Sequence, residues 1–448
     1  MYNPIRPCSI LPLRTIPTEM KRILITGSSG YIGQHLIASL LSSSSNDDDD
    51  DVSYELYCAY NTLATFESDI EHLILDAATT TTTTTKRQCE ESAKEQQQQR
   101  QRRPMARIAC IISGIDFSLP NWDTKIYHAI TEERNNCNTA SCNGNNSDEG
   151  GIVFDVIIHL AAISSPTKCQ DDPKTTMQVN CPTRLLSMAS VIIYMSTDQV
   201  YEGNRSYHTE EEVDDDDNIL PVNPINVYGQ SKAKFENCLL KSKRHAGSII
   251  LRCSFVLGPA PPLLHGCGKG MDCPTFLQFV ERRLKSNTST DYYIDEYRSV
   301  VHINDVVLTI RHFLNNACLT PPPLTTTTTT TATTSTTTKE TTKKVVTRVY
   351  NLGGSTRVSR YDIAIGVANY LRLDTSSIKA VNRPIIGSGS TIIGTTGGGG
   401  GGGGAVPSPA DISMNVSKLT NELGVERMLG LDEIVALTYG ENGMHICS

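Results

Sequence analysis

The sequence predicts an α/β fold: a Rossmann-type, doubly wound parallel sheet with a smaller C-terminal substrate lobe and several disordered low-complexity insertions. Short apolar runs alternate with amphipathic helical patterns along the chain, as in parallel α/β proteins. The first apolar run stops at a glycine triplet that is followed by a helical pattern, which is the arrangement of a dinucleotide-binding loop. The low-complexity segments fall between these elements, where loops tolerate extra length.

The first expected strand covers residues 21–26 and stops at Gly27, as a buried parallel strand should. Helical periodicity follows over residues 34–41. The other predicted strands lie at 54–60, 107–112, 153–160, 191–195 and 249–252, and the other predicted helices lie at 122–130, at 173–189 and from about residue 228.

One connection is unusually short. The helix over 173–189 leaves almost no residues before the strand that begins at Val191. A crossover between parallel strands needs a turn at this point. The spacing therefore raises the alternative that residues are missing here through a gene-model error.

Low-complexity composition divides the chain, because such segments cannot bury enough apolar surface to offset their ordering entropy. Residues 1–19 form an expected disordered leader, for which a transit peptide and a start at Met20 are alternatives. The expected units are an NAD(P)-binding domain at 20–258, mainly a substrate lobe at 259–424 and a tail at 425–448, with insertions at 42–51, 79–103, 135–150, 320–344 and 386–406.

The net charge of −8 comes largely from two acidic runs, at 47–51 and 214–217. Acidic runs favour solvated loops, whereas a nucleic-acid-binding face needs a basic patch. No apolar run reaches the roughly 20 residues that a membrane helix needs. We therefore expect a cytoplasmic protein whose partners include neither a nucleic acid nor a membrane.

The 14 cysteines are scattered and form no C-x-x-C pair, which indicates a reducing compartment. His265, Cys267 and Cys273 lie close together in the sequence, but their spacing matches no zinc motif and glycines surround them. We expect a loop insertion there and no metal site.

The glycine triplet has a separate purpose at each position. Gly27 permits the tight turn after the strand, Gly30 lets the backbone approach a pyrophosphate, and Gly33 lets the helix pack closely on the sheet. The N-terminus of the helix then offers oriented N–H groups to the phosphates. The residues of this loop that we expect at the cofactor are Gly27, Ser29, Gly30, Tyr31, Ile32 and Gly33.

The end of the second strand favours NADP(H) over NAD(H). Dinucleotide folds specific for NAD usually place an acidic residue there to bind the ribose hydroxyls. Residues 59–62 read Ala-Tyr-Asn-Thr, so no carboxylate would repel a 2′-phosphate. Asp116, after the third strand, is expected at the adenine, with a helix-capping role as the alternative.

A second constellation points to carbonyl chemistry. Tyr228 and Lys232 lie four residues apart and therefore share one face of a helix. A neighbouring ammonium and a positive nicotinamide ring favour the phenolate, which should move the pKa of the tyrosine from about 10 toward the working range. Thr197, at the carboxyl end of the fifth strand, would polarise the carbonyl. We expect Thr197, Tyr228 and Lys232 to be catalytic.

Several segments resemble the extended short-chain dehydrogenases of the dTDP-4-dehydrorhamnose reductase group, which also contains the regulatory beta subunit of methionine adenosyltransferase. The resemblance runs from about residue 21 to 424 between the insertions. The matching segments include Ile-Thr-Gly-x-x-Gly-Tyr-Ile-Gly-Gln-His-Leu at 25–36, Val-Ile-Ile-His-Leu-Ala-Ala at 156–162, Ser-Thr-Asp-Gln-Val-Tyr-Glu-Gly at 196–203, Pro-x-Asn-x-Tyr-Gly-Gln-Ser-Lys at 224–232 and Tyr-Arg-Ser-Val-Val-His-Ile-Asn-Asp-Val-Val at 297–307.

The resemblance implies further roles. Leu160, Ala161, Ala162 and Asn180 would lie at the cofactor, together with Tyr228 and Lys232. Asp198, Arg298 and the segment near Asp411 would contribute to the substrate site. The short connection before the fifth strand departs from the family pattern and puts the placement of Thr197 in doubt.

The resemblance leaves two functions open. The first is NAD(P)H-dependent reduction of a keto group on a nucleotide-activated sugar, and the Thr197, Tyr228 and Lys232 set favours it. The second is a non-catalytic, NADP-binding regulatory subunit that would partner the methionine adenosyltransferase catalytic subunit. One fold hosts both, so the fold cannot decide between them.

Overall fold

The computed structural model describes twelve segments of the chain. The expected leader at 1–19 lies outside them, as do most residues of the expected insertions and the cluster of His265, Cys267 and Cys273. The described residues are 20–42, 53–61, 70, 106–136, 153–210, 222–242, 245, 247–262, 275–319, 347–383, 393–394 and 406–440.

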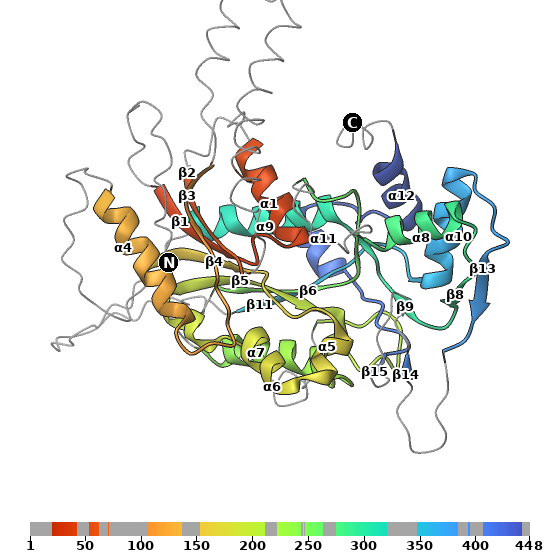
Figure 1. Ribbon diagram of the computed structural model, residues 1–448, viewed down its shortest axis with the longest axis horizontal. Helices are drawn as coiled ribbons and strands as arrows, with labels where there is room; N and C mark the ends of the chain where they lie inside the picture. The colour runs from red at the N-terminus through yellow and green to blue at the C-terminus, as the bar shows by residue number, and fades with distance from the viewer. Residues whose placement is uncertain are drawn as a thin grey trace, which may run out of the picture.

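A seven-stranded sheet forms the centre of the molecule, in the order β11-β6-β5-β4-β1-β2-β3 (Figure 1). All six pairings in this sheet are parallel, which confirms the doubly wound α/β fold. The strands are β1 (Met20–Thr26), β2 (Ser53–Ala59), β3 (Ala106–Ile112), β4 (Phe154–His159), β5 (Ala189–Thr197), β6 (Ile249–Cys253) and β11 (Arg348–Leu352).

Both faces of the sheet are covered, which explains the continuous apolar runs in its strands. Ile23 and Ile25 pack toward one face and Leu24 toward the other, as the alternation of a strand requires. In Figure 1, α1 and α9 lie above the sheet and α6 and α7 lie below it. The helices around the sheet are α1 (Tyr31–Ser42), α4 (Trp122–Asn136), α5 (Pro166–Asp171), α6 (Pro173–Asn180), α7 (Val227–Lys241), α9 (Ile303–Leu319) and α11 (Ser417–Leu423).

The expected helix over 173–189 is wrong in extent. Helix α6 ends at Asn180, the 3-10 turn η1 spans Thr183–Ser187, and β5 already begins at Ala189. Pro182 explains the break, because proline lacks an N–H and disfavours the helical conformation of the residue before it. The short 3-10 segment therefore closes the crossover to β5, which pairs in register with β4.

A smaller lobe packs beside the carboxyl ends of the strands and has its own apolar cluster. The expected domain boundary at residue 258 does not coincide with the division between the sheet and the smaller lobe. Strand β11 comes later in the chain but belongs to the sheet, and α9, also later, packs on the sheet. Helix α12 lies within the expected tail. The elements of the lobe are α8 (Phe276–Lys285), α10 (Arg360–Leu371) and α12 (Leu431–Tyr439), with the strand pairs β7 (Val256–Leu257) and β10 (Val301–His302), β8 (Thr290–Tyr293) and β13 (Ile378–Val381), β9 (Tyr297–Arg298) and β12 (Val358–Ser359), and β14 (Ile393–Gly394) and β15 (Val406–Pro407).

Within the described segments, no helix combines the length and apolar character needed to cross a membrane. The same residues contain no group of three or more His, Cys, Asp or Glu side chains that could hold a metal ion.

Candidate active site

The glycine loop joins β1 to α1 at the point where the strand order reverses. Gly27 has a φ of 71°, and a Cβ on it would lie 2.7 Å from the backbone nitrogen of Ala161. A Cβ on Gly33 would lie 2.5 Å from the carbonyl oxygen of Gly27. Both positions therefore require glycine, and the close approach sets the loop against the end of β4.

The outer side of this loop is open. Gly30 is exposed, and Ser29, Tyr31 and Ile32 are half-buried around the N-terminus of α1. The amide of Gln34 fixes the loop by donating to the carbonyl of Ser29 at 2.7 Å. Backbone N–H groups of a first helical turn have no partner inside the helix, so this loop fits the phosphates of a dinucleotide.

The ends of β2 and β3 lie next to the glycine loop in the sheet order. Residues 59–61 contain no acidic side chain, and Thr62 lies outside the described residues. Asp116 accepts hydrogen bonds from the backbone nitrogen and hydroxyl of Ser118, at 2.9 and 2.6 Å. This carboxylate therefore closes a turn that leads toward α4, and its contact with adenine remains a prediction.

Asn180 is fully buried between two parts of the site. Its amide accepts from the nitrogen of Ile163 at 2.8 Å and donates to the carbonyl of Ile163 at 3.1 Å and to the hydroxyl of Ser231 at 2.9 Å. These bonds tie the loop after β4, which contains Leu160, Ala161 and Ala162, to helix α7. The expected cofactor contact of Asn180 remains a prediction; the contacts observed here are with the protein.

The three expected catalytic side chains come together at the carboxyl end of β5. Thr197 is the last residue of β5, Tyr228 lies in the first turn of α7, and Lys232 lies one turn later. The hydroxyl of Thr197 donates to Asp198 at 3.2 Å and accepts from the nitrogen of Gln199 at 3.2 Å, and it lies close enough to Tyr228 to lower the pKa of the phenol. The short connection before β5 therefore does not displace Thr197 from its partner.

Burial controls the ionisation of this site. It raises the pKa of Tyr228 well above 10, and the neighbouring Thr197 hydroxyl opposes the rise only in part. The expected lowering of this pKa is therefore not found in the protein alone. Burial lowers the pKa of Lys232 to about 7, against the opposing effect of Glu236.

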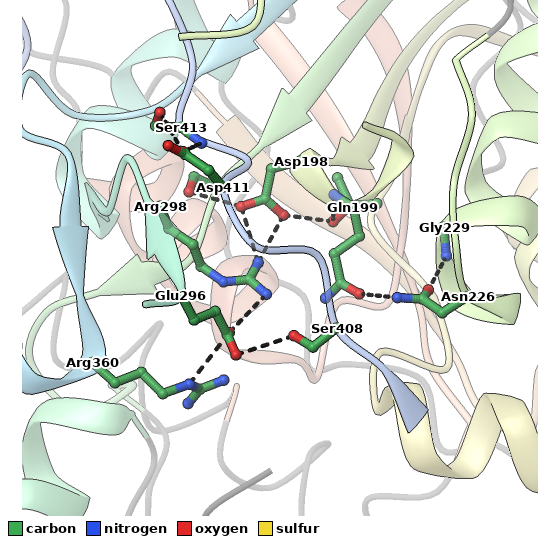
Figure 2. Close-up of polar contacts among 12 residues, drawn as sticks. Asp198, Gln199, Asn226, Gly229, Glu296, Arg298, Arg360, Ser408, Asp411 and Ser413 are labelled. Carbon is green, nitrogen blue, oxygen red and sulfur yellow. Dashed lines mark hydrogen bonds and ion pairs between the residues drawn. The ribbon is translucent and has the colours of Figure 1, made fainter. Parts of the chain in front are cut away.

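Residues outside the expected set hold α7 in position. Asn226 caps the helix by accepting from the nitrogen of Gly229 at 2.9 Å and donates to Gln199 at 2.8 Å (Figure 2). A Cβ on Gly229 would overlap the carbonyl oxygen of Gln199. The polar residue just before an expected helix was the available signal for Asn226.

A buried ion pair lies behind the site. Arg252 on β6 and Glu236 on α7 are each 2% exposed, and their nearest charged atoms are 2.8 Å apart. Glu236 also accepts from the hydroxyl of Ser196. An arginine inside an apolar strand was the signal for this pair, because a buried charge requires a partner.

The two expected substrate residues bind each other. Arg298 donates to both carboxylate oxygens of Asp198 at 3.1 Å, and it also pairs with Glu296 at 3.4 Å (Figure 2). Glu296 pairs in turn with Arg360 at 3.4 Å. We name Asp198, Glu296, Arg298 and Arg360 the interlobe cluster, because it joins the end of β5 to the smaller lobe.

The two carboxylates of the interlobe cluster are buried and its two arginines are half-buried, and their charges offset one another. Burial raises the pKa of Asp198 although Arg298 opposes the rise. Burial would also raise the pKa of Glu296, but Arg360 and Arg298 together lower it below its usual value.

Two surface hollows lie away from the catalytic side chains. One of about 420 Å³ lies along the outer side of α7 beside Lys234 and Cys238, and one of about 320 Å³ lies beside Tyr201 and Arg252. Neither is lined by Tyr228 or Lys232, so the candidate site rests on the arrangement of its residues.

Comparisons with known proteins were made for the whole chain. A family model described as the RmlD substrate binding domain matches residues 124–268. The chain is 21% identical over 248 residues to methionine adenosyltransferase 2 subunit beta of Bos taurus, covering 53% of this chain and 62% of that protein. It is 27% identical over 159 residues to dTDP-4-dehydrorhamnose reductase of Mycolicibacterium smegmatis, covering 34% and 43%. The matches to these curated relatives thus span less than two thirds of their length.

Solved structures share the fold. The structure of dTDP-4-dehydrorhamnose reductase from Bacillus anthracis in complex with NADP has a TM-score of 0.52 at 14% identity, covering 94% of this chain and 98% of that one. UDP-glucose 4-epimerase from Thermotoga maritima with UDP-glucose has a TM-score of 0.54 at 15% identity, covering 93% and 97%. The family model and the curated relatives show that part of the chain is similar to proteins of the dTDP-4-dehydrorhamnose reductase-like family, and the solved structures show that it shares their fold.

Proposed function

We propose that this protein is an NADP(H)-dependent reductase of the dTDP-4-dehydrorhamnose reductase type, which reduces a keto group on a nucleotide-activated sugar. The observation that supports it is the grouping of Thr197, at the end of β5, with Tyr228 and Lys232, one turn apart on α7, where Thr197 lies close enough to Tyr228 to affect the pKa of the phenol. This set lies at the carboxyl end of β5, on the edge of the sheet where the glycine loop also lies.

The glycine loop suits a dinucleotide. Gly27, Ser29, Gly30 and the first turn of α1 would hold the pyrophosphate, and the segment 160–162 would lie beside the nicotinamide half. When bound, the dinucleotide supplies the hydride. The absence of a carboxylate at 59–61 favours the 2′-phosphate of NADP(H).

The protonation state of Tyr228 suits reduction. A reductase must donate a proton to the oxygen of the new alcohol, so its acid has to be protonated beforehand. Burial keeps Tyr228 protonated, and Thr197 would polarise the carbonyl oxygen that receives the proton. Lys232 then stabilises the phenolate that remains and would hold the ribose hydroxyls.

The substrate site would lie between the catalytic side chains and the smaller lobe. Asp198 and Arg298 come from the two sides of this boundary. Relatives with the same fold are described with nucleotide sugars, as in the epimerase complex with UDP-glucose. We therefore propose a nucleotide sugar as the substrate of this chain.

The test uses the purified full chain with NADPH and a dTDP-4-keto-6-deoxysugar. We expect substrate-dependent loss of the nicotinamide absorbance, and we expect Tyr228→Phe to reduce kcat by roughly 10²–10⁴-fold, the range for removal of a general acid. Tyr127→Phe on α4 lies outside the site and should keep the wild-type rate. Equal rates for wild type and Tyr228→Phe would contradict the proposal.

A second function is favoured by one observation. The match to methionine adenosyltransferase 2 subunit beta covers 248 residues, whereas the match to the reductase covers 159. As a regulatory subunit, the chain would bind NADP without turnover and associate with a methionine adenosyltransferase catalytic subunit. Silence of both wild type and Tyr228→Phe, together with co-purification of that enzyme, would support this second function over the first.

A further inference from the structure

The ammonium group of Lys232 is buried against an aromatic ring. Its Nζ lies 4.5 Å from the ring centroid of Tyr194, and the residue is 2% exposed. An aromatic face carries negative electrostatic potential and attracts a cation, most strongly where water is excluded. Tyr194 lies on β5 and was expected only as an apolar strand residue.

The ring of Tyr194 is fixed on all sides. Its hydroxyl donates to the carbonyl of Lys232 at 3.3 Å, so the same residue contacts both the backbone and the charge of the lysine. The imidazole of His159 stacks on the ring with centroids 5.5 Å apart and planes 17° apart. Phe235 meets it edge-on at 4.8 Å.

The nearest carboxylate is engaged elsewhere. Glu236 lies one helical turn after Lys232, but it pairs with Arg252 at 2.8 Å and accepts from Ser196. Its field still favours the charged lysine, as the direction of its effect shows. The direct contact of the ammonium is therefore with the ring of Tyr194.

The other titratable groups around Lys232 are neutral at working pH. They come from α5, β6, β4 and its own helix. Burial raises the pKa values of the thiols of Cys169 and Cys253 and of the phenol of Tyr228, and it lowers the pKa of His159.

We propose that Tyr194 is a positioning residue whose ring holds Lys232 charged and in place at the active site. The kinetic consequence rests on the proposed function, because it assumes that Lys232 binds NADP(H) and stabilises the phenolate of Tyr228. The consequence for the charge of Lys232 does not depend on that function. Loss of the ring should make the ammonium easier to deprotonate, without a change in any residue that contacts the ligand.

The most specific test weakens the negative potential of the ring face without changing the shape of the ring. Tyr194→Phe keeps the face of the ring, and 3,4,5-trifluorophenylalanine introduced at position 194 keeps the shape but removes most of the negative potential on the face. The midpoint of the pH dependence of NADPH affinity, read by fluorescence, should stay within 0.3 units for Tyr194→Phe. It should fall by about one unit for the fluorinated ring.

The direction in which NADPH affinity changes with pH follows from the positive charge of the lysine. Affinity should decline as the pH rises through the pKa of Lys232, and the fluorinated protein should show this decline at lower pH. At pH 7 its affinity for NADPH should be roughly fivefold weaker, and the difference should approach tenfold above about pH 8, which is what a shift of one unit implies. Tyr57→Leu removes another buried tyrosine from the same apolar cluster and should leave the midpoint unchanged.

A separate measurement keeps this proposal distinct from the proposed function. The titration of the Lys232 side chain can be followed by NMR in ¹⁵N-lysine-labelled protein, with Lys232→Met identifying the signal. If wild type does not bind NADPH, the proposed function fails, and the same shift of about one unit should still appear in this titration. Equal midpoints for the phenyl and trifluorophenyl rings would overturn the role of Tyr194.

Discussion

At the scale of single residues, the site holds two groups whose ionised forms are both penalised by burial. Tyr228 keeps its proton because burial raises its pKa, and burial lowers the pKa of Lys232 to about 7. In the proposed reduction, the phenol would give its proton away as the product oxygen receives it. Lys232 would then be the nearby cation that stabilises the phenolate.

Lys232→Met should stabilise the protein and abolish tight NADPH binding. The folded pKa of Lys232 lies below that of an unfolded lysine, so between about pH 7 and 10.4 the unfolded chain binds more protons and wild-type stability rises with pH. The gain in the free energy of unfolding should be roughly 1–3 kcal/mol at pH 6.5 and should shrink by pH 9. Urea unfolding at the two pH values measures it. A variant that is less stable than wild type at pH 6.5 would contradict this account.

Sequence patterns identify functional residues whose partners lie only a few positions away in the chain. The glycine loop and the Tyr228 and Lys232 pair depend on spacings of three and four residues, and the structure places both as expected. Tyr194 has no such signal, because an aromatic residue in a buried strand is ordinary packing in most proteins. Its contact with Lys232 depends on how α7 lies on the sheet.

At the scale of elements, the docking of α7 decides where the candidate catalytic side chains lie. The helix approaches the 3-10 turn η2 (Asp198–Val200) so closely that Gly229 is the residue that fits against Gln199. Asn226 adds a side-chain bridge between the same two elements. The sequence predicted α7 and β5 separately, but the distance between them depends on these contacts.

Gly229→Ala should move α7. The added Cβ would overlap a backbone carbonyl that cannot rotate away, so we expect a loss of roughly 1–3 kcal/mol in stability and a fall in kcat. Gly366→Ala in α10 is the matched control, since its Cβ would lie 3.3 Å from the end of the flexible Leu431 side chain. The control should remain within about 1 kcal/mol of wild type. Urea denaturation and NADPH oxidation rates would show whether the two variants differ.

The helix predicted over 173–189 ends earlier than expected for a local reason. The periodicity over 173–189 continues past Pro182 and predicts one helix. Proline removes an N–H and restricts Cys181, so the helix ends at Asn180. The apolar residues that follow belong instead to η1 and to the start of β5.

At the scale of the whole molecule, the interlobe cluster joins the sheet to the smaller lobe. Asp198 and Arg298 are 100 positions apart, so no local pattern could pair them. The resemblance suggested that both contact substrate, and that role remains a prediction. Their mutual ion pair also makes them a structural connection at the edge of the proposed cleft.

Arg298→Met should destabilise the protein strongly, because it leaves two buried carboxylates with one cation fewer. We expect a loss of roughly 3–5 kcal/mol near pH 7.5. The loss should be smaller at pH 5, where Asp198, whose pKa burial already raises, can become protonated. Lys285→Met removes a surface pair with Glu281 and should change stability by less than about 1 kcal/mol. Chemical denaturation at the two pH values measures the free energy of unfolding of both variants. Equal losses for Arg298→Met and Lys285→Met would contradict this account.

The pairing of β6 with β11 has a consequence for biosynthesis. Ile249 lies beside Arg348 in the finished sheet, so the ribosome must synthesise the whole intervening stretch before this seventh strand can join. Until then β6 is an open edge, the kind of surface that invites pairing with another nascent chain. A gene fragment ending at residue 258 would encode the glycine loop and the catalytic residues and would still release a polypeptide with an unprotected edge.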